Sequence, residues 1–569
     1  MRFDYTLDSQ RGGVATAMTL EASLTAPGAP YELVYTDGPH GRVRVFRHAP
    51  ATLPEFLRTL AAFADRPLLV HESQRLSYRQ IFDRTAGIAY ELGNRGVTRG
   101  SRVVIAMRNS CECVAAILAV LAIGAVPVFI NSRGTRDEIT DGVRMARCSI
   151  MLVDQRCAAA LSEAPPAGVA ILDESMLVGM PPRDDFFSRL ATGVAPDDPA
   201  AILFTSGTAG RPKAAVLTHR GVMTSLWANL YAGALIGLRT AEKLGIDMAT
   251  LAAQMQSPCL LLVYPLFHTS GLHSGLLPTL ARGARCVMMK RWSGVDALRL
   301  IQAERITQAP GVPTMFWDML KVEERGQFDL SSLTSIATGG QAMPVNLLAD
   351  MRAAFPRAVI GNGYGLTEAN GAVSLVVGED FLARPTTSGV VLPTLEVRFM
   401  RTAHTEAAPG EPGEVWVRGA SVMREYFDDP AATEEAFHEG WLRTGDVGYL
   451  DDEGFIYIVD RKRDMIISAG ENIYCAEVER VLLEHPGVFE ASTFGVVDDR
   501  LGEKLVAAVV PRGGCDVTEA DLQAWVGGRL AAYKVPRRVW TSDTPLVRND
   551  MGKVDKVAMR QRFAQFSRG

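Results

Sequence analysis

The chain has 569 residues, of which 47% are hydrophobic and 22% charged, and its formal net charge is −5. This balance is typical of a globular protein with a large core, and it excludes a strongly basic surface of the kind that binds nucleic acid. The eight cysteines lie among apolar neighbours without the paired spacing of a zinc site. We therefore expect reduced thiols and a cytoplasmic protein.

Two features bear on export and on membrane insertion. The N-terminal residues carry charges and lack the apolar stretch of a signal peptide. The longest apolar run, residues 111–130, is interrupted by Glu112, Gly124 and Pro127. These residues predict a buried helix followed by a buried strand, and no transmembrane segment.

Helical and strand patterns alternate along the first part of the chain. A hairpin is expected over residues 31–50, with Asp37 and Gly38 permitting its turn. Further elements are expected as helices at 53–64, 76–95 and 111–123 and as strands at 102–107 and 149–154. This alternation predicts a mainly parallel α/β sheet with helices on both faces.

A loop rich in hydroxyls and glycines follows an apolar strand pattern. Residues 205–213 read Thr-Ser-Gly-Thr-Ala-Gly-Arg-Pro-Lys. The glycines allow backbone N–H groups to approach an anion, the hydroxyls add donors, and Lys213 adds a positive charge. The order of glycine and lysine differs from that of a Walker A loop. The stretch predicts a phosphate-binding loop of another kind, although taken alone it is also compatible with a structureless linker.

Residues 260–271 are expected to form a strand that runs into a loop ending at Gly271. His268 in this loop could act as a general base, and together with His273 it could hold a metal. A packed polar side chain is the commoner role for a histidine beside a phenylalanine. The position is still informative, because open α/β sheets bind ligands at the carboxyl ends of their strands.

Three later stretches are suited to binding a nucleotide. Gly339 and Gly340 follow a strand pattern and would let a flat ring approach the backbone. Residues 361–368 hold an aromatic ring, a hydroxyl and a carboxylate between glycines. Asp446 offers a carboxylate that can accept hydrogen bonds from both hydroxyls of a ribose.

The pattern changes at the charged residues 460–464. Before them the sequence is typical of a β-meander, and after them an α+β pattern begins, with helices expected near 475–484 and 518–530. Near the end, the turn sequence Asn-Asp-Met-Gly would present Lys553 at the tip of a loop.

Four of these motifs, in this order, resemble those of the adenylate-forming superfamily, which includes acyl-CoA synthetases, luciferases and the adenylation domains of peptide synthetases. They are residues 205–213, 361–368, 441–446 and 552–553. The resemblance covers residues 53–569. It implies an α/β fold with a large N-terminal domain of α/β sheets, helices and a β-rich subdomain over residues 1–459. A hinge at 460–464 and a small mobile α+β domain over residues 465–569 would complete the chain.

The resemblance also implies roles for individual residues. Lys553 is the expected adenylation lysine, Glu368 the expected Mg2+ ligand, and Tyr364 the expected stacking partner of adenine. The remaining catalytic candidates are Thr205 and His268. The nucleotide- and CoA-binding candidates are Thr205, Ser206, Gly207, Thr208, Gly210, Lys213, Gly339, Gly340, Gln341, Asn362, Gly363, Tyr364, Gly365, Thr367, Asp446, Arg461 and Gly470. One glutamate suffices for magnesium, because this ion commonly takes one carboxylate together with substrate phosphates.

The implied reaction has two steps. ATP activates a carboxylic acid to an acyl-adenylate with release of pyrophosphate, and coenzyme A then takes the acyl group as a thioester with release of AMP. Residues 469–474, Ala-Gly-Glu-Asn-Ile-Tyr, resemble acyl-CoA synthetases more than peptide synthetases. The implied partners are thus the acid, ATP and CoA, and a homodimer is compatible with the resemblance.

A largely apolar acyl pocket is expected from Phe267, Trp317, Ala369, Ala372 and Val373. Such a pocket favours a fatty or aryl acid, and the aspartate that holds the α-amine of an amino acid is missing. Two alternatives stay open at this point. One is transfer of the acyl group to a carrier protein or another non-CoA acceptor, and the other is a catalytically silent nucleotide-binding protein.

Overall fold

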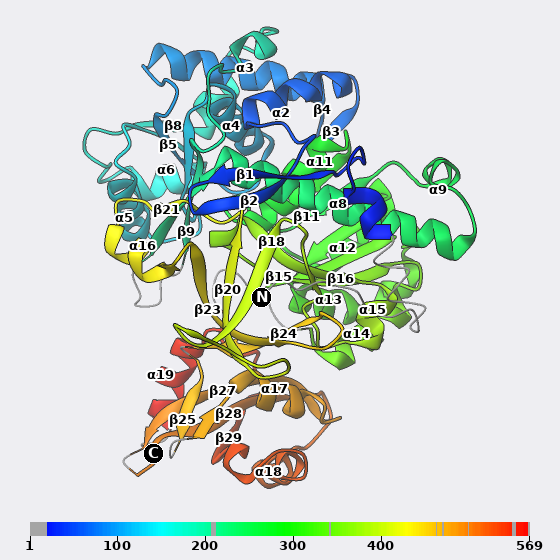
Figure 1. Ribbon diagram of the computed structural model, residues 1–569. Helices are drawn as coiled ribbons and strands as arrows, with labels where there is room; N and C mark the ends of the chain where they lie inside the picture. Colours follow the sequence, from blue (N-terminus) through cyan, green and yellow to red (C-terminus); the bar gives the residue numbers. More distant parts are fainter. Residues whose placement is uncertain are drawn as a thin grey trace.

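A computed structural model describes residues 20–205, 212–340, 343–462, 464–468, 471–498, 500–548 and 554–566. A large domain, coloured from blue to yellow, carries three extended sheets and most of the helices (Figure 1). A small domain, coloured orange and red, lies against one end of it. The predicted α/β class, with a large N-terminal and a small C-terminal domain, is confirmed.

The first sheet has seven strands, in the order β21 (Glu425–Tyr426), β10 (Lys213–Thr218), β9 (Pro199–Thr205), β6 (Val126–Phe129), β5 (Arg102–Ala106), β7 (Ile150–Val153) and β8 (Ala170–Asp173). The pairings from β9 to β8 are parallel, whereas β10 and β21 add an antiparallel edge. The helices of this region are α3 (Tyr78–Asn94), α4 (Cys111–Ala122), α5 (Arg136–Ala146), α6 (Gln155–Leu161) and α7 (Glu174–Gly179).

The second sheet has nine strands, in the order β17 (Val390–Val391), β16 (Gly371–Val377), β15 (Val359–Leu366), β14 (Ser335–Gly339), β13 (Gln308–Gly311), β11 (Cys259–Leu262), β12 (Arg285–Met288), β3 (Pro67–His71) and β4 (Gln74–Ser77). The pairings from β15 to β3 are parallel. Its helices are α2 (Leu53–Thr59), α8 (His219–Leu244), α9 (Met248–Gln254), α10 (Thr269–Gly271), α11 (Leu277–Ala281), α12 (Gly294–Glu304), α13 (Pro313–Leu320), α14 (Val345–Ala354) and α15 (Glu379–Ala383).

The third sheet is the predicted β-rich region. Its strands are β19 (Thr405–Glu406), β18 (Leu395–Thr402), β20 (Gly413–Gly419), β23 (Trp441–Leu450), β22 (Phe437–His438) and β24 (Ile456–Arg461), with α16 (Pro430–Ala436) beside them. The predicted N-terminal hairpin is confirmed as β1 (Leu33–Gly38) and β2 (Gly41–Phe46). Its pairing continues to Gly38 and Gly41, so the turn is Pro39-His40 and lies two residues beyond the predicted turn.

The small domain has a sheet and a core of its own. The strands are β26 (Glu471–Ile473), β25 (Ile466–Ser468), β28 (Gly502–Pro511), β27 (Val488–Asp498) and β29 (Arg538–Thr541), and the helices are α17 (Cys475–Leu483), α18 (Glu519–Gly527) and α19 (Lys556–Phe566). The two helices expected here are confirmed. The last strand of the large domain ends at Arg461 and β25 begins at Ile466, but the exact domain limits and the hinge stay predictions.

The predicted helix and strand of residues 111–130 are confirmed as α4 and β6. All residues of α4 are buried, because apolar neighbours cover the helix on every side. By length and composition alone α8 could cross a membrane, a test that the core helix of a soluble protein also passes. Much of its first half, from His219 to Tyr231, is packed in the core.

The strand and the loop expected over residues 260–271 are confirmed as far as His268, but the loop does not extend to Gly271. β11 covers only Cys259–Leu262, and residues 269–281 form α10, a π-helical turn and α11. Gly271 is needed for close packing rather than for ending a loop, because a Cβ atom there would lie 2.1 Å from the carbonyl oxygen of Pro265.

Candidate active site

The candidate site lies where the three sheets of the large domain meet. The first sheet contributes the antiparallel pair β9–β10, in which Thr205 is the register partner of Lys213. The Thr205 hydroxyl donates to the Lys213 carbonyl over 3.4 Å. Both residues are half-buried. They mark the two ends of the predicted phosphate loop, whose members Ser206, Gly207, Thr208 and Gly210 lie outside the described residues.

Tyr426 on β21 stands between Lys213 and Glu368. The Lys213 Nζ atom lies 5.0 Å from the centre of the Tyr426 ring, and the Tyr426 hydroxyl donates to Glu368 Oε1 over 2.9 Å. Burial and the charge of Glu368 raise the pKa of Tyr426, so its hydroxyl stays protonated as a donor. Lys213 also lies 3.8 Å from the exposed carboxylate of Glu435.

Glu368 belongs to a short 3-10 turn, Thr367–Ala369, that follows β15. Its carbonyl oxygen accepts a hydrogen bond from the N–H of Met423 over 2.7 Å, which ties the turn to the segment before β21. The half-buried carboxylate therefore has a defined place next to Tyr426, and Thr367 begins the same turn.

A second carboxylate, Asp446 on β23, is 5% exposed. The Tyr364 hydroxyl donates to its Oδ2 over 2.6 Å, and Arg461 Nε lies 3.2 Å from its Oδ1. Burial and the Asp446 charge raise the pKa of Tyr364 well above its usual value, so this hydroxyl too stays a donor. Three predicted site residues from β15, β23 and β24 thus form one polar cluster.

The glycines of the second sheet flank this cluster. Gly339 and Gly363 are register partners on the parallel strands β14 and β15. Gly340 has a φ of +78°, which glycine adopts without strain. At Gly365 a Cβ atom would lie 2.1 Å from the carbonyl oxygen of Gly371, so this glycine is required by strand packing. Gln341 lies outside the described residues.

Asn362 is buried, and its side-chain amide is hydrogen-bonded within the second sheet. The Thr338 hydroxyl donates to its Oδ1 over 3.2 Å, and its Nδ2 donates to the Thr387 carbonyl over 3.3 Å. These bonds hold β15 against β14 and against the segment before β17. The side chain therefore supports the strand that carries Tyr364.

His268 lies half-buried at the start of α10, with its ring centre 4.4 Å from that of Phe267. His273 is fully enclosed, and burial lowers its pKa to about 4. A neutral imidazole of this kind is a packed residue rather than a cation. In the part of the chain that the structure describes, no group of three or more His, Cys, Asp or Glu side chains could hold a metal by itself.

Glu368 nevertheless fits magnesium. Mg2+ commonly binds through one or two carboxylates together with substrate phosphates and keeps several waters. The carboxylate lies near Thr205 and Lys213, which border the predicted phosphate loop, because Tyr426 bridges the two sides. Glu368 would hold the ion, which when bound would neutralise phosphate charge.

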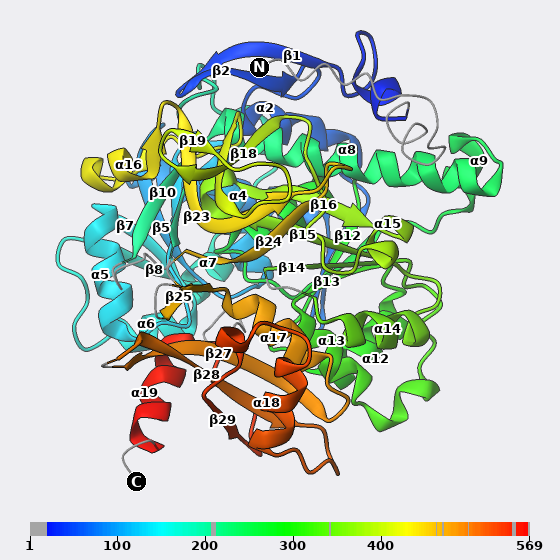
Figure 2. The ribbon, with the colours of Figure 1, turned by 60° about the horizontal axis from the view of Figure 1, so that its bottom comes forward.

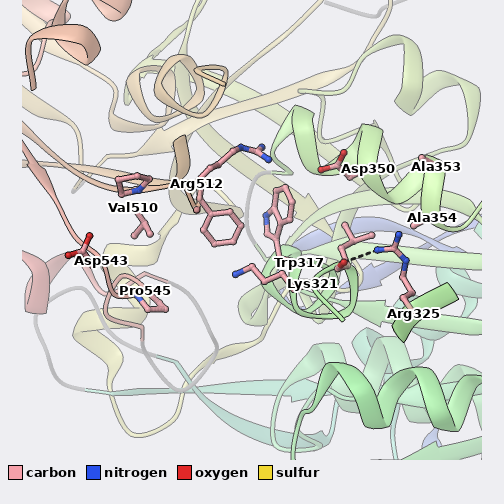
Figure 3. A pocket seen from close by; sticks show the side chains of 14 residues that line it. Trp317, Lys321, Arg325, Asp350, Ala353, Ala354, Val510, Arg512, Asp543 and Pro545 are labelled. Carbon is pink, nitrogen blue, oxygen red and sulfur yellow. Dashed lines mark hydrogen bonds between the residues drawn. The ribbon is translucent and has the colours of Figure 1, made fainter. Parts of the chain in front are cut away.

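The structure places Trp317 away from the expected acyl pocket. Its ring packs edge-on against Phe489 of the small domain, with the ring centres 5.2 Å apart. It lines a cavity of about 800 Å³ together with Lys321, Arg325 and Arg512 (Figure 3). The cavity lies where α13 and α14 face the small domain, an arrangement that Figure 2 shows. The reason is helix geometry: Phe316, one position earlier on α13, is fully buried, and the next side chain points about 100° away.

Two cations follow Asp446 at the end of the large domain. Arg461 is the register partner of Asp446, and Lys462 Nζ lies 3.2 Å from Glu414 Oε2. The two remaining predicted residues of this part of the chain, Gly470 and Lys553, lie outside the described residues.

Sequence reasoning missed Tyr426. It lies in a strand of two residues, and its neighbours Glu425 and Phe427 carry no motif. Only the pairing of β21 with β10 brings its hydroxyl to Glu368, so no local pattern could have identified it.

Comparison with known proteins adds to this geometry. Residues 56–427 match the sequence model of the family described as AMP-binding enzyme, and residues 477–553 match the family described as AMP-binding enzyme C-terminal domain. A methyl-dioxo-octahydro-indenyl-propanoyl:CoA ligase from Rhodococcus jostii is 34% identical over 540 residues, which cover 90% of this chain and 99% of that protein. A 4-coumarate-CoA ligase from Narcissus pseudonarcissus is 30% identical over 89% of this chain and 92% of its own.

Solved structures give the same result. The o-succinylbenzoate CoA synthetase from Bacillus subtilis, in complex with ATP and magnesium, matches with a TM-score of 0.73 and 30% identity, over 88% of this chain and 98% of that one. The same enzyme in complex with its acyl-adenylate intermediate matches with a TM-score of 0.74 and 29% identity, over 89% of this chain and 97% of that one.

Proposed function

The chain belongs to the AMP-binding enzyme family, and from this premise we propose which acid it activates and which residues act. It is an AMP-forming acyl-CoA ligase, as the sequence resemblance implied. It uses ATP, Mg2+ and coenzyme A: the acid first displaces pyrophosphate from ATP, and the thiol of CoA then displaces AMP from the acyl-adenylate.

The proposal for the nucleotide rests on one observation, the buried carboxylate of Asp446 between Tyr364 and Arg461. Arg461 is half-exposed and can turn from Asp446 towards a phosphate, whereas Asp446 itself cannot leave. The carboxylate then accepts from the ribose hydroxyls, and the ring of Tyr364 lies against the adenine. Gly339 and Gly340 leave room for the base on its other side.

The triphosphate takes the opposite half of the site. Thr205 and Lys213 bind phosphate oxygens from β9 and β10, and Glu368 holds Mg2+ with the help of Tyr426. Attack of a carboxylate on the α-phosphate brings two anions together, so the protein contributes positioning and positive charge. Lys553 supplies the further cation for this step from the small domain, which then turns about residues 460–464 so that residues around Gly470 receive CoA.

The acid that we propose is a fatty or ring-bearing carboxylic acid. Phe267, Ala369 and Val373 are buried around the start of α10 and the end of β15, and they offer apolar surface without a carboxylate. The named relatives act on coumarate and on an indenyl-propanoyl group, both of which carry rings, and this supports the same class.

A screen of pyrophosphate release tests the proposal. Acids of graded chain length and ring content are offered with ATP and Mg2+, with and without CoA. We expect the highest kcat/KM for a fatty or aryl acid and little release with acetate or amino acids. A preference for amino acids would contradict the apolar pocket, and thioester formation on an added carrier protein in place of CoA would favour the alternative acceptor.

Two finer assignments belong to this proposal. We place the enzyme in the cytoplasm, because its cysteines are all free and most are buried, as expected of reduced thiols. We also propose a homodimer. Cell fractionation and light scattering of the purified enzyme test the two assignments, and a membrane fraction or a monomer mass would contradict them.

A further inference from the structure

The two chain segments that flank residues 549–553 are held together in the small domain. Arg548 and Val554 form an antiparallel β-bridge, and the Asp555 N–H donates to the Val547 carbonyl over 2.8 Å. Asp555 Oδ1 then accepts from the first N–H groups of α19, those of Val557 and Ala558, over 3.0 Å each. Residues 547–548 and 554–555, on the two sides of the segment that carries Lys553, therefore lie side by side. We call them the base of this segment.

A half-buried ion pair holds the C-terminal side of this base. Lys556 Nζ lies 3.0 Å from Glu479 Oε1 on α17, with 18% and 20% of the two side chains exposed. The same oxygen accepts from the Thr493 N–H over 2.7 Å and from the Ser492 hydroxyl over 3.3 Å. Burial disfavours the charge on Lys556, but the attraction of Glu479 outweighs it and raises the pKa of the lysine.

A second ion pair holds the N-terminal side. Arg548 Nη2 lies 3.0 Å from Glu490 Oε1 on β27, with 22% and 14% of the two side chains exposed. The other oxygen of Glu490 accepts from the Leu546 N–H over 3.2 Å. Each side of the Lys553 segment is thus connected by a cation to a carboxylate on the body of the small domain.

Apolar packing continues the base into α19. Met559 is fully buried and Phe563 nearly so, and the ring of Phe563 packs edge-on against Phe494 of β27 at 5.8 Å. Arg560 Nε donates to the Gly495 carbonyl over 3.2 Å. Because α19 is seated in this way without Lys556, the ion pairs are not needed merely to attach the helix.

We propose that Lys556 and Arg548 are positioning residues for the adenylation step. Their pairs with Glu479 and Glu490 orient the base of the segment so that Lys553 reaches the nucleotide, and they have no part in thioester formation. The inference rests on the proposed role of Lys553. Its physical ground is that a catalytic group displaced by 1 Å can lose about 10²-fold in rate.

The test measures the two half-reactions separately in the full-length enzyme. Pyrophosphate release is followed with a fatty or aryl acid and ATP, and thioester formation is followed with a preformed acyl-adenylate and CoA. For Lys556→Met we expect at least a tenfold lower kcat for pyrophosphate release, with the KM for ATP and the thioester rate within twofold of wild type. Lys556→Arg keeps a cation and should restore most of the lost rate.

A matched control comes from another ion pair of the small domain. Lys534 Nζ lies 2.6 Å from Glu477 Oε2, with 18% and 28% of the side chains exposed, so Lys534→Met removes a similar pair away from the base. It should leave pyrophosphate release unchanged. Should Lys556→Met fail to fold, Arg548→Met serves in its place, and the same selective loss is expected.

Two results would overturn the inference: an equal fall in both half-reactions, or no fall in either. Lys553→Ala separates this failure from a failure of the proposed function. If Lys553→Ala abolishes pyrophosphate release while Lys556→Met and Arg548→Met do not, the positioning role alone is wrong. If Lys553→Ala itself retains pyrophosphate release, the proposed role of Lys553 is wrong, and the inference falls with it.

Discussion

Asp446 in the large domain and Glu479 in the small domain are two carboxylates in similar surroundings. Each has low exposure, each accepts a short hydrogen bond from the protein, and each lies about 3 Å from one cation, Arg461 at 3.2 Å and Lys556 at 3.0 Å. The cations differ: 46% of the Arg461 side chain is exposed, against 18% of Lys556.

The difference in exposure between the two cations suits Asp446 to binding a ligand and Glu479 to holding Lys556 in place. An exposed cation can leave its carboxylate at little cost, because water replaces the lost interaction. A largely buried cation leaves its carboxylate at a higher cost, because less water reaches it to replace the lost interaction. We therefore expect substitutions around Asp446 to change affinity for the nucleotide and substitutions around Glu479 to change the rate of one step.

The largest expected effect tests the small-domain side of this comparison. Lys553→Ala should lower the rate of acid-dependent pyrophosphate release about 10²–10³-fold, since removing one donor to a developing charge costs about 2.7–4 kcal/mol. Thioester formation from a preformed acyl-adenylate should be retained. Single-turnover measurements of pyrophosphate release and of thioester formation test this prediction. An equal loss of both rates would contradict the proposal that Lys553 acts only in the first step.

Asp446→Ala tests the large-domain side. Loss of hydrogen bonds to a charged acceptor costs about 1.5–3 kcal/mol, so apparent ATP affinity should fall about 10–100-fold. The KM for ATP in pyrophosphate release measures this change. Asp141→Asn is the control, because this exposed carboxylate pairs with Arg144 on the surface of α5 and should leave the KM unchanged. An unaltered ATP affinity in Asp446→Ala would exclude the ribose role.

Asp460 sharpens the comparison because it links the two regions. It ends the third sheet next to Arg461, and the charges that face it are those of Lys556, Glu479 and Asp464. Burial raises the pKa of Asp460 to about 6. Between about pH 4 and pH 6 the native state therefore binds more protons than the unfolded state, so this group lowers stability as the pH rises.

The Asp460→Asn substitution should remove this penalty. At pH 7 the variant should be more stable than wild type by about 2–3 kcal/mol, and the difference should vanish near pH 4. Urea unfolding of both proteins across this pH range provides the measurement. A difference in stability that is the same at every pH would show that the pKa of Asp460 is not raised in the native state.

The smallest effect concerns the hydroxyl of Tyr364. Tyr364→Phe keeps the ring but removes the 2.6 Å hydrogen bond to Asp446, which should cost about 1.5 kcal/mol and raise the KM for ATP about tenfold. Tyr364→Ala should cost more, because the ring itself is lost. If the two variants behave alike, the ring does not contact the base.

Much of this protein was predictable from local sequence. Helices and strands such as α4 and β6 follow from apolar runs and their interruptions, because burial of a continuous apolar surface is a local property of composition. The hydroxyl- and glycine-rich stretch after β9 and the Tyr364-containing stretch were recognisable for the same reason: backbone approach and donor type are properties of neighbouring residues.

The tertiary structure alone decided which of these groups meet. Tyr364 reaches Asp446 across 82 positions and Tyr426 reaches Glu368 across 58, and both contacts depend on how separate sheets pack. Sequence periodicity gave no indication that Trp317 faces the small domain, or that Lys556 is anchored by Glu479. A motif specifies the chemistry that a residue can perform, whereas the partners that orient it are brought by the packing of distant strands.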